Sequence, residues 1–272
     1  MKPLDHGPHD PSANYTPQSG KAELHLGYAC DLECAGCNRA SFLRKPHTHA
    51  LTLDDAREFY RQARELNWKP RIVIIGGEPT MSHDFEAHVQ LAEDFSDEAV
   101  QVFSNGYAPR ARQALANIRM TNRVSVAEES FKRAGSVEES GSGRPEWSND
   151  IFVSAADRGD PLRGPCYQHS AIICGISVDH EGYSPCAMGG MVSAILGVAG
   201  RTKVLADLFD RAKAAEMTRA ICEHCGHQLS LQSGARAGGD GMHRHKAYAA
   251  TLPIKFGAPM SPTWEKAFEG RR

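Results

Sequence analysis

The sequence has no apolar run that approaches the roughly 18 residues of a membrane-spanning helix. Its first twenty residues contain four prolines and no apolar core of the kind that a secretion signal has, so residues 1–20 are expected to be a disordered lead-in. A strong net charge is also missing, because 31 Lys and Arg residues nearly balance 33 Asp and Glu residues. These absences argue against binding to nucleic acid or to a membrane, and they predict a cytoplasmic location.

Cysteines are absent from the middle of the chain, where none of the eight lies between residues 38 and 165. In a reducing cytosol, clustered cysteines indicate metal binding or catalysis more often than disulfides. One set is early and the other is late in the chain. The two sets are Cys30, Cys34 and Cys37, and Cys166, Cys174, Cys186, Cys222 and Cys225.

Short apolar runs alternate with helical patterns between the two cysteine sets. The run Arg71–Ile75 is β-branched, as is typical of a strand buried on both faces, and Thr52–Leu66 has a threonine N-cap and one apolar face. This alternation predicts a parallel α/β sheet with right-handed crossovers over residues 21–160. The expected strands are 22–29, 71–75, 99–103, 123–127 and 151–155, and the expected helices are 52–66, 84–95 and 110–118.

The alternation stops after residue 160. A hairpin is expected at Ile176–Ser184, with its turn at Gly182, followed by a helix at Thr202–Met217 and by a CxxC pair at Cys222 and Cys225. We therefore assign residues 161–230 to a small cysteine-rich region and residues 231–272 to a C-terminal tail.

The early cysteines have the spacing CxxxCxxC and directly follow the first expected strand. Three thiolates on one tight loop suit a corner of a [4Fe–4S] cube and leave its fourth iron open to another molecule. Zinc is the competing interpretation, although structural zinc takes four protein ligands. The polar residues from Arg39 to His49 that follow are expected to form a solvated loop, and the alternative is a polar rim that receives a polar or anionic substrate.

A second motif ends the buried strand Arg71–Ile75. Parallel α/β folds place ligand-binding loops at this end of a strand. Glycines permit close backbone approach, and a carboxylate can accept a hydrogen bond from a ligand ammonium group. The alternative interpretation is an ordinary turn. The motif consists of Gly76, Gly77, Glu78 and Pro79.

With these two motifs in this order, residues 21–157 resemble the radical S-adenosylmethionine (SAM) superfamily. The resemblance implies a partial (βα)6 TIM-like barrel whose strand C-termini hold SAM and a [4Fe–4S] cluster. It implies that Cys30, Cys34 and Cys37 ligate this cluster, and that Glu78 binds the methionyl amino group.

The same resemblance suggests four further contacts with the polar groups of SAM. They follow the third and fourth expected strands, and each is also a plausible cap of a helix or turn. The family usually has an aromatic residue before the third cysteine, where this chain has Gly36. The four suggested contact residues are Ser104, Asn105, Glu128 and Ser130.

The late cysteines resemble a Twitch domain, the shorter relative of the SPASM domain, in which four cysteines around a hairpin ligate an auxiliary [4Fe–4S] cluster. Three residues separate Gly182 from Cys186, one fewer than in the usual pattern. Zinc on the same four residues is the alternative. The fifth cysteine is either a plain core residue or a catalytic hydrogen-atom donor. The expected ligands are Cys166, Cys186, Cys222 and Cys225, with Cys174 as the spare thiol, although Cys166 and Cys174 can exchange roles.

The resemblance implies a reaction in which SAM is cleaved reductively to a 5′-deoxyadenosyl radical that removes a substrate hydrogen. The layout is similar to that of 2-deoxy-scyllo-inosamine dehydrogenases. It implies dehydrogenation of a small polar substrate, with the auxiliary cluster as electron acceptor and a flavodoxin- or ferredoxin-type electron donor. Epimerisation with Cys174 as hydrogen donor and maturation of a ribosomally made peptide remain open. A non-catalytic iron–sulfur or zinc scaffold is the alternative outside the enzymes.

Overall fold

The computed structural model describes residues 20–31, 39, 49–106, 108–118, 123–126, 155–158, 175–225 and 261–269. Strands and helices alternate through the first half of these residues, as expected. The elements are β1 (Lys21–His25), α1 (Leu53–Glu65), β2 (Arg71–Ile75), the 3-10 helix η2 (Pro79–Met81), α2 (Phe85–Phe95), β3 (Gln101–Ser104), α3 (Pro109–Ala116), β4 (Arg123–Val126), α5 (Ala155–Arg158), β5 (Ile176–Asp179), β6 (Gly182–Ser184), α7 (Gly189–Leu196), the 3-10 helix η5 (Leu205–Leu208), α8 (Arg211–Cys222) and α10 (Pro262–Phe268).

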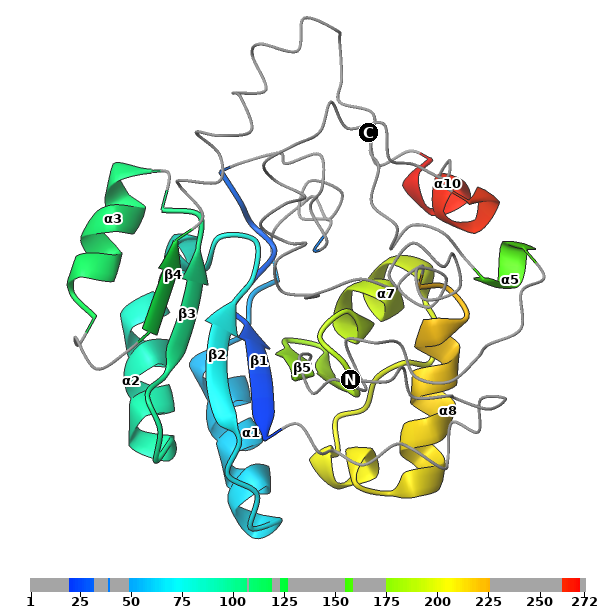
Figure 1. Cartoon of the computed structure of the whole chain (residues 1–272), viewed down its shortest axis with the longest axis horizontal. Coiled ribbons are helices and arrows are strands. Elements are labelled where there is room, and N and C mark those ends of the chain that lie inside the picture. Colours follow the sequence, from blue (N-terminus) through cyan, green and yellow to red (C-terminus); the bar gives the residue numbers. More distant parts are fainter. Residues whose placement is uncertain are drawn as a thin grey trace, which may run out of the picture.

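The described strands form one sheet in the order β4-β3-β2-β1-β5-β6, whose first five members can be followed from left to right in Figure 1. Every neighbouring pair is parallel except the β5–β6 hairpin. The predicted α/β class with a mainly parallel sheet is confirmed. The hairpin pairs with β1 on the side away from β2, so it continues the sheet that the first half of the chain begins.

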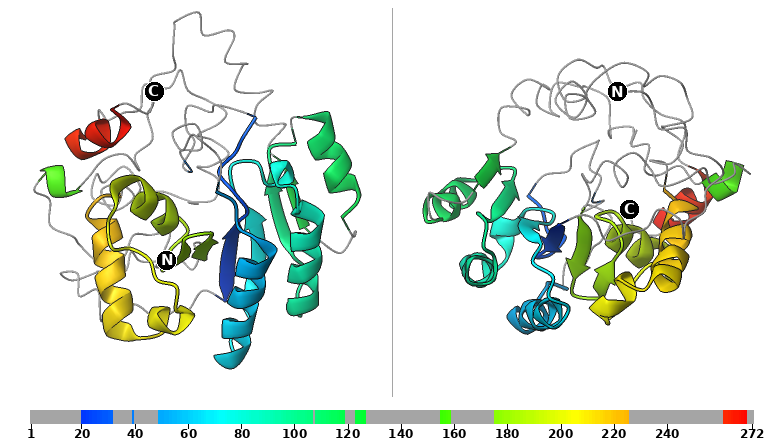
Figure 2. Two further views of the ribbon diagram at one scale, coloured as in Figure 1. Left: turned by 180° about the vertical axis from the view of Figure 1, so that it is seen from behind. Right: turned by 60° about the horizontal axis from the view of Figure 1, so that its bottom comes forward.

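Helix α1 shows how the outer layer is built. Thr52 and Asp55 form a capping box, in which each side chain accepts a hydrogen bond from the other residue's backbone N–H. The buried face of α1, which includes Phe59, packs with α2 against one face of the sheet (Figure 2). Leu24 on β1 and Ile74 on β2 point into this packed layer. Because side chains alternate along a strand, the residues next to Leu24 and Ile74 in their strands point to the opposite face of the sheet, which we call the inner side.

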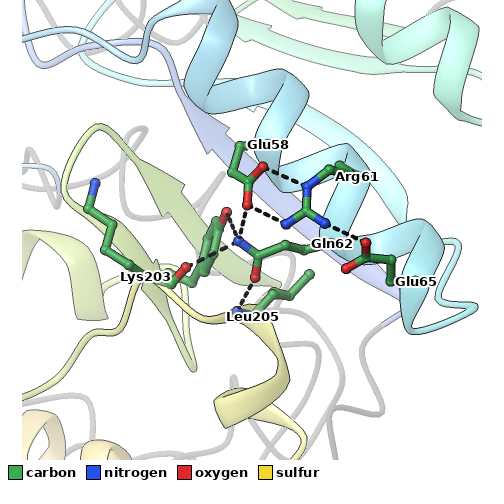
Figure 3. Close-up of polar contacts among 7 residues, drawn as sticks. Glu58, Arg61, Gln62, Glu65, Lys203 and Leu205 are labelled. Atoms are coloured by element: carbon green, nitrogen blue, oxygen red, sulfur yellow. Dashed lines mark hydrogen bonds and ion pairs between the residues drawn. The ribbon is translucent and has the colours of Figure 1, made fainter.

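Gln62 on α1 ties this layer to the chain that follows the hairpin (Figure 3). Its side-chain nitrogen donates to the Glu58 carboxylate at 2.9 Å, to the Tyr183 hydroxyl at 3.3 Å and to the Lys203 carbonyl at 3.2 Å. Its oxygen accepts from the Leu205 N–H at 2.6 Å. Hydrogen bonds from Arg61 and then Gln62 lower the pKa of Glu58 to about 2. One amide therefore fixes η5 and the hairpin against α1.

The secondary structure of the second half differs from the expectations in two places. The helix expected at Thr202–Met217 is wrong, because Asp210 caps the N–H groups of Ala212 and Lys213 and starts α8 there. Helix α7 was not expected, because it begins with two glycines and most of its residues are buried, which hides its period. Residues 151–154 of a further expected strand lie outside the described residues, and Ala155 begins α5.

Among the helices of the described residues, none is both long and apolar enough to cross a lipid bilayer.

Candidate active site

The glycines of the second motif are needed for packing of the backbone. A Cβ on Gly76 would lie 2.4 Å from the Gly27 carbonyl oxygen, and a Cβ on Gly77 would lie 2.3 Å from that of Ala29. The N–H groups of Gly77 and Glu78 donate to the same two carbonyls at 3.0 and 2.7 Å. The end of β2 is therefore seated directly on the segment that leads from β1 into Cys30, and only glycine leaves room for this contact.

Glu78 is buried, with 2% of its surface exposed, and its carboxylate is held by four hydrogen bonds. Oε1 accepts from the Thr80 N–H at 3.0 Å, the Thr80 hydroxyl at 2.5 Å and the Ser104 hydroxyl at 2.9 Å. Oε2 accepts from the Asn105 N–H at 2.7 Å. Because each carboxylate oxygen has two lone pairs, Oε2 keeps capacity for one more donor.

Asn105 connects this carboxylate to the first cysteine. Its amide nitrogen donates to the Asp31 carboxylate at 2.6 Å and lies 3.8 Å from the Cys30 sulfur. Cys30, Glu78 and Asn105 follow β1, β2 and β3 respectively, at the same edge of the sheet. The structure thus brings together a thiol, which can ligate an iron–sulfur cluster, and a preorganised carboxylate, which can accept a hydrogen bond from the ammonium of SAM.

The residues facing the inner side of β1 and β5 are polar. Glu23 and His25 come from β1, and Ser177 and Asp179 come from β5; all four are buried. The Tyr28 hydroxyl, two residues before Cys30, donates to the Asp179 carboxylate at 3.0 Å. The sequence analysis did not pick out these residues, although alternation in β1 signals that Glu23 and His25 share a face.

Arg39 corrects another expectation. The solvated loop expected to begin at Arg39 does not include that side chain, which is only 10% exposed. Its guanidinium donates to the Glu23 carboxylate at 3.0 Å and to the Ala187 carbonyl at 2.8 Å. Arg39 therefore connects the early cysteine loop, two residues after Cys37, to the residue that follows Cys186.

The described late cysteines gather around α7 and α8. Cys186 precedes α7, Cys222 ends α8 and Cys225 follows three residues later. Cys225 belongs to an apolar cluster against which Cys186 packs, and Cys222 and Cys225 are both buried. Within the described ranges, no three His, Cys, Asp or Glu side chains are grouped closely enough to hold a metal ion.

The remaining candidates divide into two kinds. Pro79 is the first residue of η2 and is buried, which suits the start of a short helix. The others lie outside the described residues: Cys34, Cys37, Glu128, Ser130, Cys166 and Cys174.

Comparison with protein families matches residues 24–148 to the Radical SAM superfamily. No curated protein was found to match the chain.

Two solved proteins are among those to which the chain is similar. SuiB of Streptococcus suis bound to its precursor peptide SuiA is 20% identical over 39% of this chain and 23% of SuiB, with a TM-score of 0.32. This chain therefore spans about a quarter of SuiB. BtrN in complex with AdoMet and 2-DOIA is 16% identical over 76% of this chain and 92% of BtrN, with a TM-score of 0.45.

Proposed function

We propose, from the match of residues 24–148 to the Radical SAM superfamily, that the chain cleaves SAM to a 5′-deoxyadenosyl radical that removes a hydrogen atom from a small polar substrate. The proposal rests on one observation: Asn105 contacts both Glu78 and Cys30, and the three residues follow the carboxyl ends of three parallel strands. A bound [4Fe–4S] cluster supplies the electron that breaks the SAM C5′–S bond.

The chain's own residues bind and orient SAM in this proposal. Cys30, with Cys34 and Cys37, would hold the cluster, which would supply an iron for binding of SAM. Oε2 of Glu78 accepts a hydrogen bond from the amino group, because Thr80, Ser104 and Asn105 already fix the carboxylate's position. Burial of this carboxylate strengthens the interaction by keeping water away.

The reaction that we propose for the substrate is a dehydrogenation. Removal of a carbon-bound hydrogen atom leaves a substrate radical, which becomes a carbonyl when it also loses a hydroxyl proton and one electron. An auxiliary [4Fe–4S] cluster on Cys186, Cys222, Cys225 and Cys166 is the proposed acceptor of that electron, and Cys174 is the spare thiol. The buried polar residues along β1 and β5 support a polar substrate. A flavodoxin- or ferredoxin-type protein is the proposed source of the first electron.

Iron and sulfide analysis with EPR under anaerobic conditions tests this proposal. The wild-type protein is expected to hold about eight irons, and a Cys30/Cys34/Cys37→Ala variant about four, because only the early cluster loses its ligands. The variant should no longer cleave SAM. About four irons in the wild type and none in the variant, with zinc recovered instead, would remove the auxiliary cluster and with it the dehydrogenation.

A further inference from the structure

We infer that α10 and α5 together clamp the cysteine knuckle, defined as residues 222–225, and that Trp264 is the positioning residue of this clamp. The inference rests on the proposed function, in which the knuckle supplies two ligands to the auxiliary cluster. Helix α10 lies beside α7 near the end of α8, although 36 residues separate Cys225 from Pro262 (Figures 1 and 2).

The two residues between the knuckle cysteines are held by their backbone carbonyls. The Glu223 carbonyl accepts a hydrogen bond from the Ala156 N–H at 3.0 Å, and the His224 carbonyl accepts one from the Trp264 indole N–H at 2.8 Å. Carbonyls at the end of a helix have no partner within the helix, so they need one from elsewhere. Because one donor comes from α5 and the other from α10, two distant segments set the orientation of the turn.

Trp264 also contributes apolar contact. Its side chain is fully buried in the cluster that includes Met191 and Cys225, and Cys186 packs against the same cluster. A buried indole N–H requires a hydrogen-bond partner, and here that partner is a knuckle carbonyl. The ring and its N–H therefore act on the same turn, the ring by excluding water and the N–H by fixing a carbonyl.

Asp157 on α5 binds the first turn of α10, at the residue before Trp264. One carboxylate oxygen accepts from the Thr263 N–H at 2.9 Å and the other from the Thr263 hydroxyl at 2.6 Å. Partial burial raises the pKa of Asp157, but hydrogen bonds from Thr263 and Ser261 outweigh it and hold the pKa below its ordinary value. A helix of seven residues is unstable alone, so this cap and the burial of Trp264 determine whether α10 is present at the knuckle.

Groups that orient a metal ligand without touching the metal commonly change metal affinity 10- to 100-fold when they are removed. Trp264→Phe keeps most of the ring and removes the N–H. We expect this variant to release the irons of the auxiliary cluster to a chelator about 10- to 100-fold faster than the wild type. The early cluster should keep its EPR signal and its response to SAM, because Trp264 lies on α10, whereas Cys30 and Glu78 follow β1 and β2.

The matched control is Trp68→Phe, which changes another tryptophan that packs beside Phe59 and Phe209 in the outer layer. This control should release iron at the wild-type rate. A Trp264→Phe variant that also releases iron at that rate would overturn the clamp. A Cys222/Cys225→Ser variant separates this failure from failure of the proposed function. Loss of about four irons from that variant supports the auxiliary cluster, whereas full retention of iron refutes it.

Discussion

Replacement of Glu78 by glutamine is expected to weaken SAM binding by about 10- to 100-fold while leaving the iron content unchanged. The carboxylate accepts four hydrogen bonds, three at Oε1 and one at Oε2. A glutamine amide places an NH2 group against at least one of these donors, whichever way it is turned. It also removes the negative charge that the proposal places beside the ammonium of SAM. Hydrogen bonds to charged groups contribute about 1.5–3 kcal/mol each, which corresponds to the expected loss of affinity.

Equilibrium binding of SAM to the anaerobically reconstituted protein measures this effect. Glu98→Gln is a suitable control, because Glu98 is an exposed carboxylate outside the site. The control should bind SAM as the wild type does. An unchanged dissociation constant for Glu78→Gln would show that Glu78 does not contact the amino group.

Gly77→Ala should lower the free energy of unfolding by about 3 kcal/mol or more and should deplete iron from the early cluster. The added Cβ would lie 2.3 Å from the Ala29 carbonyl oxygen and 2.7 Å from that of Tyr28. Both atoms belong to the backbone, so no side-chain rotation can relieve the overlap, and overpacking of this kind is costly. The chain must shift at Ala29, next to Cys30. Urea unfolding and iron analysis on the same samples measure the two effects.

Gly27→Ala is the control for this substitution. A Cβ on Gly27 would lie 3.8 Å from the Ala50 Cβ, which is an ordinary contact, so this variant should fold and load iron normally. If Gly77→Ala also folded and held the full complement of iron, the close approach of β2 to the cysteine loop would not be what requires glycine.

Local signals predicted much of the first half of the fold. The β-branched run Arg71–Ile75 is β2 from end to end, and Thr52 caps α1 as its type and position indicate. The position of Glu78 at the carboxyl edge of the sheet could also be predicted, because its motif ends a buried parallel strand, and its contact with SAM stays a prediction. The predictions of β2 and of the cap of α1 are confirmed, because each depends on residues close together in sequence.

The missed contacts join distant parts of the chain. Tyr28 donates to Asp179 across 151 positions, and Arg39 reaches Ala187 across 148. No periodicity or spacing indicates such pairs. The side chain of Arg39 was expected to be exposed to solvent because its neighbours in sequence are polar, but it is buried. Helix α7 was not predicted because most of its residues are buried, so its sequence lacks the alternation of polar and apolar faces that marks a surface helix.

The clamp also has a consequence for the order in which the protein is made. The knuckle leaves the ribosome first, and Pro262, which starts the helix that carries Trp264, is added 37 positions after Cys225. At about 5–20 residues per second, roughly 2–7 s pass during translation before that helix begins. Throughout this interval the His224 carbonyl is without its indole donor, and the apolar cluster around Cys225 is incomplete. If the knuckle ligates a cluster as proposed, iron delivered during synthesis would meet a turn without this support, so we expect the cluster to be inserted after the later residues have been made.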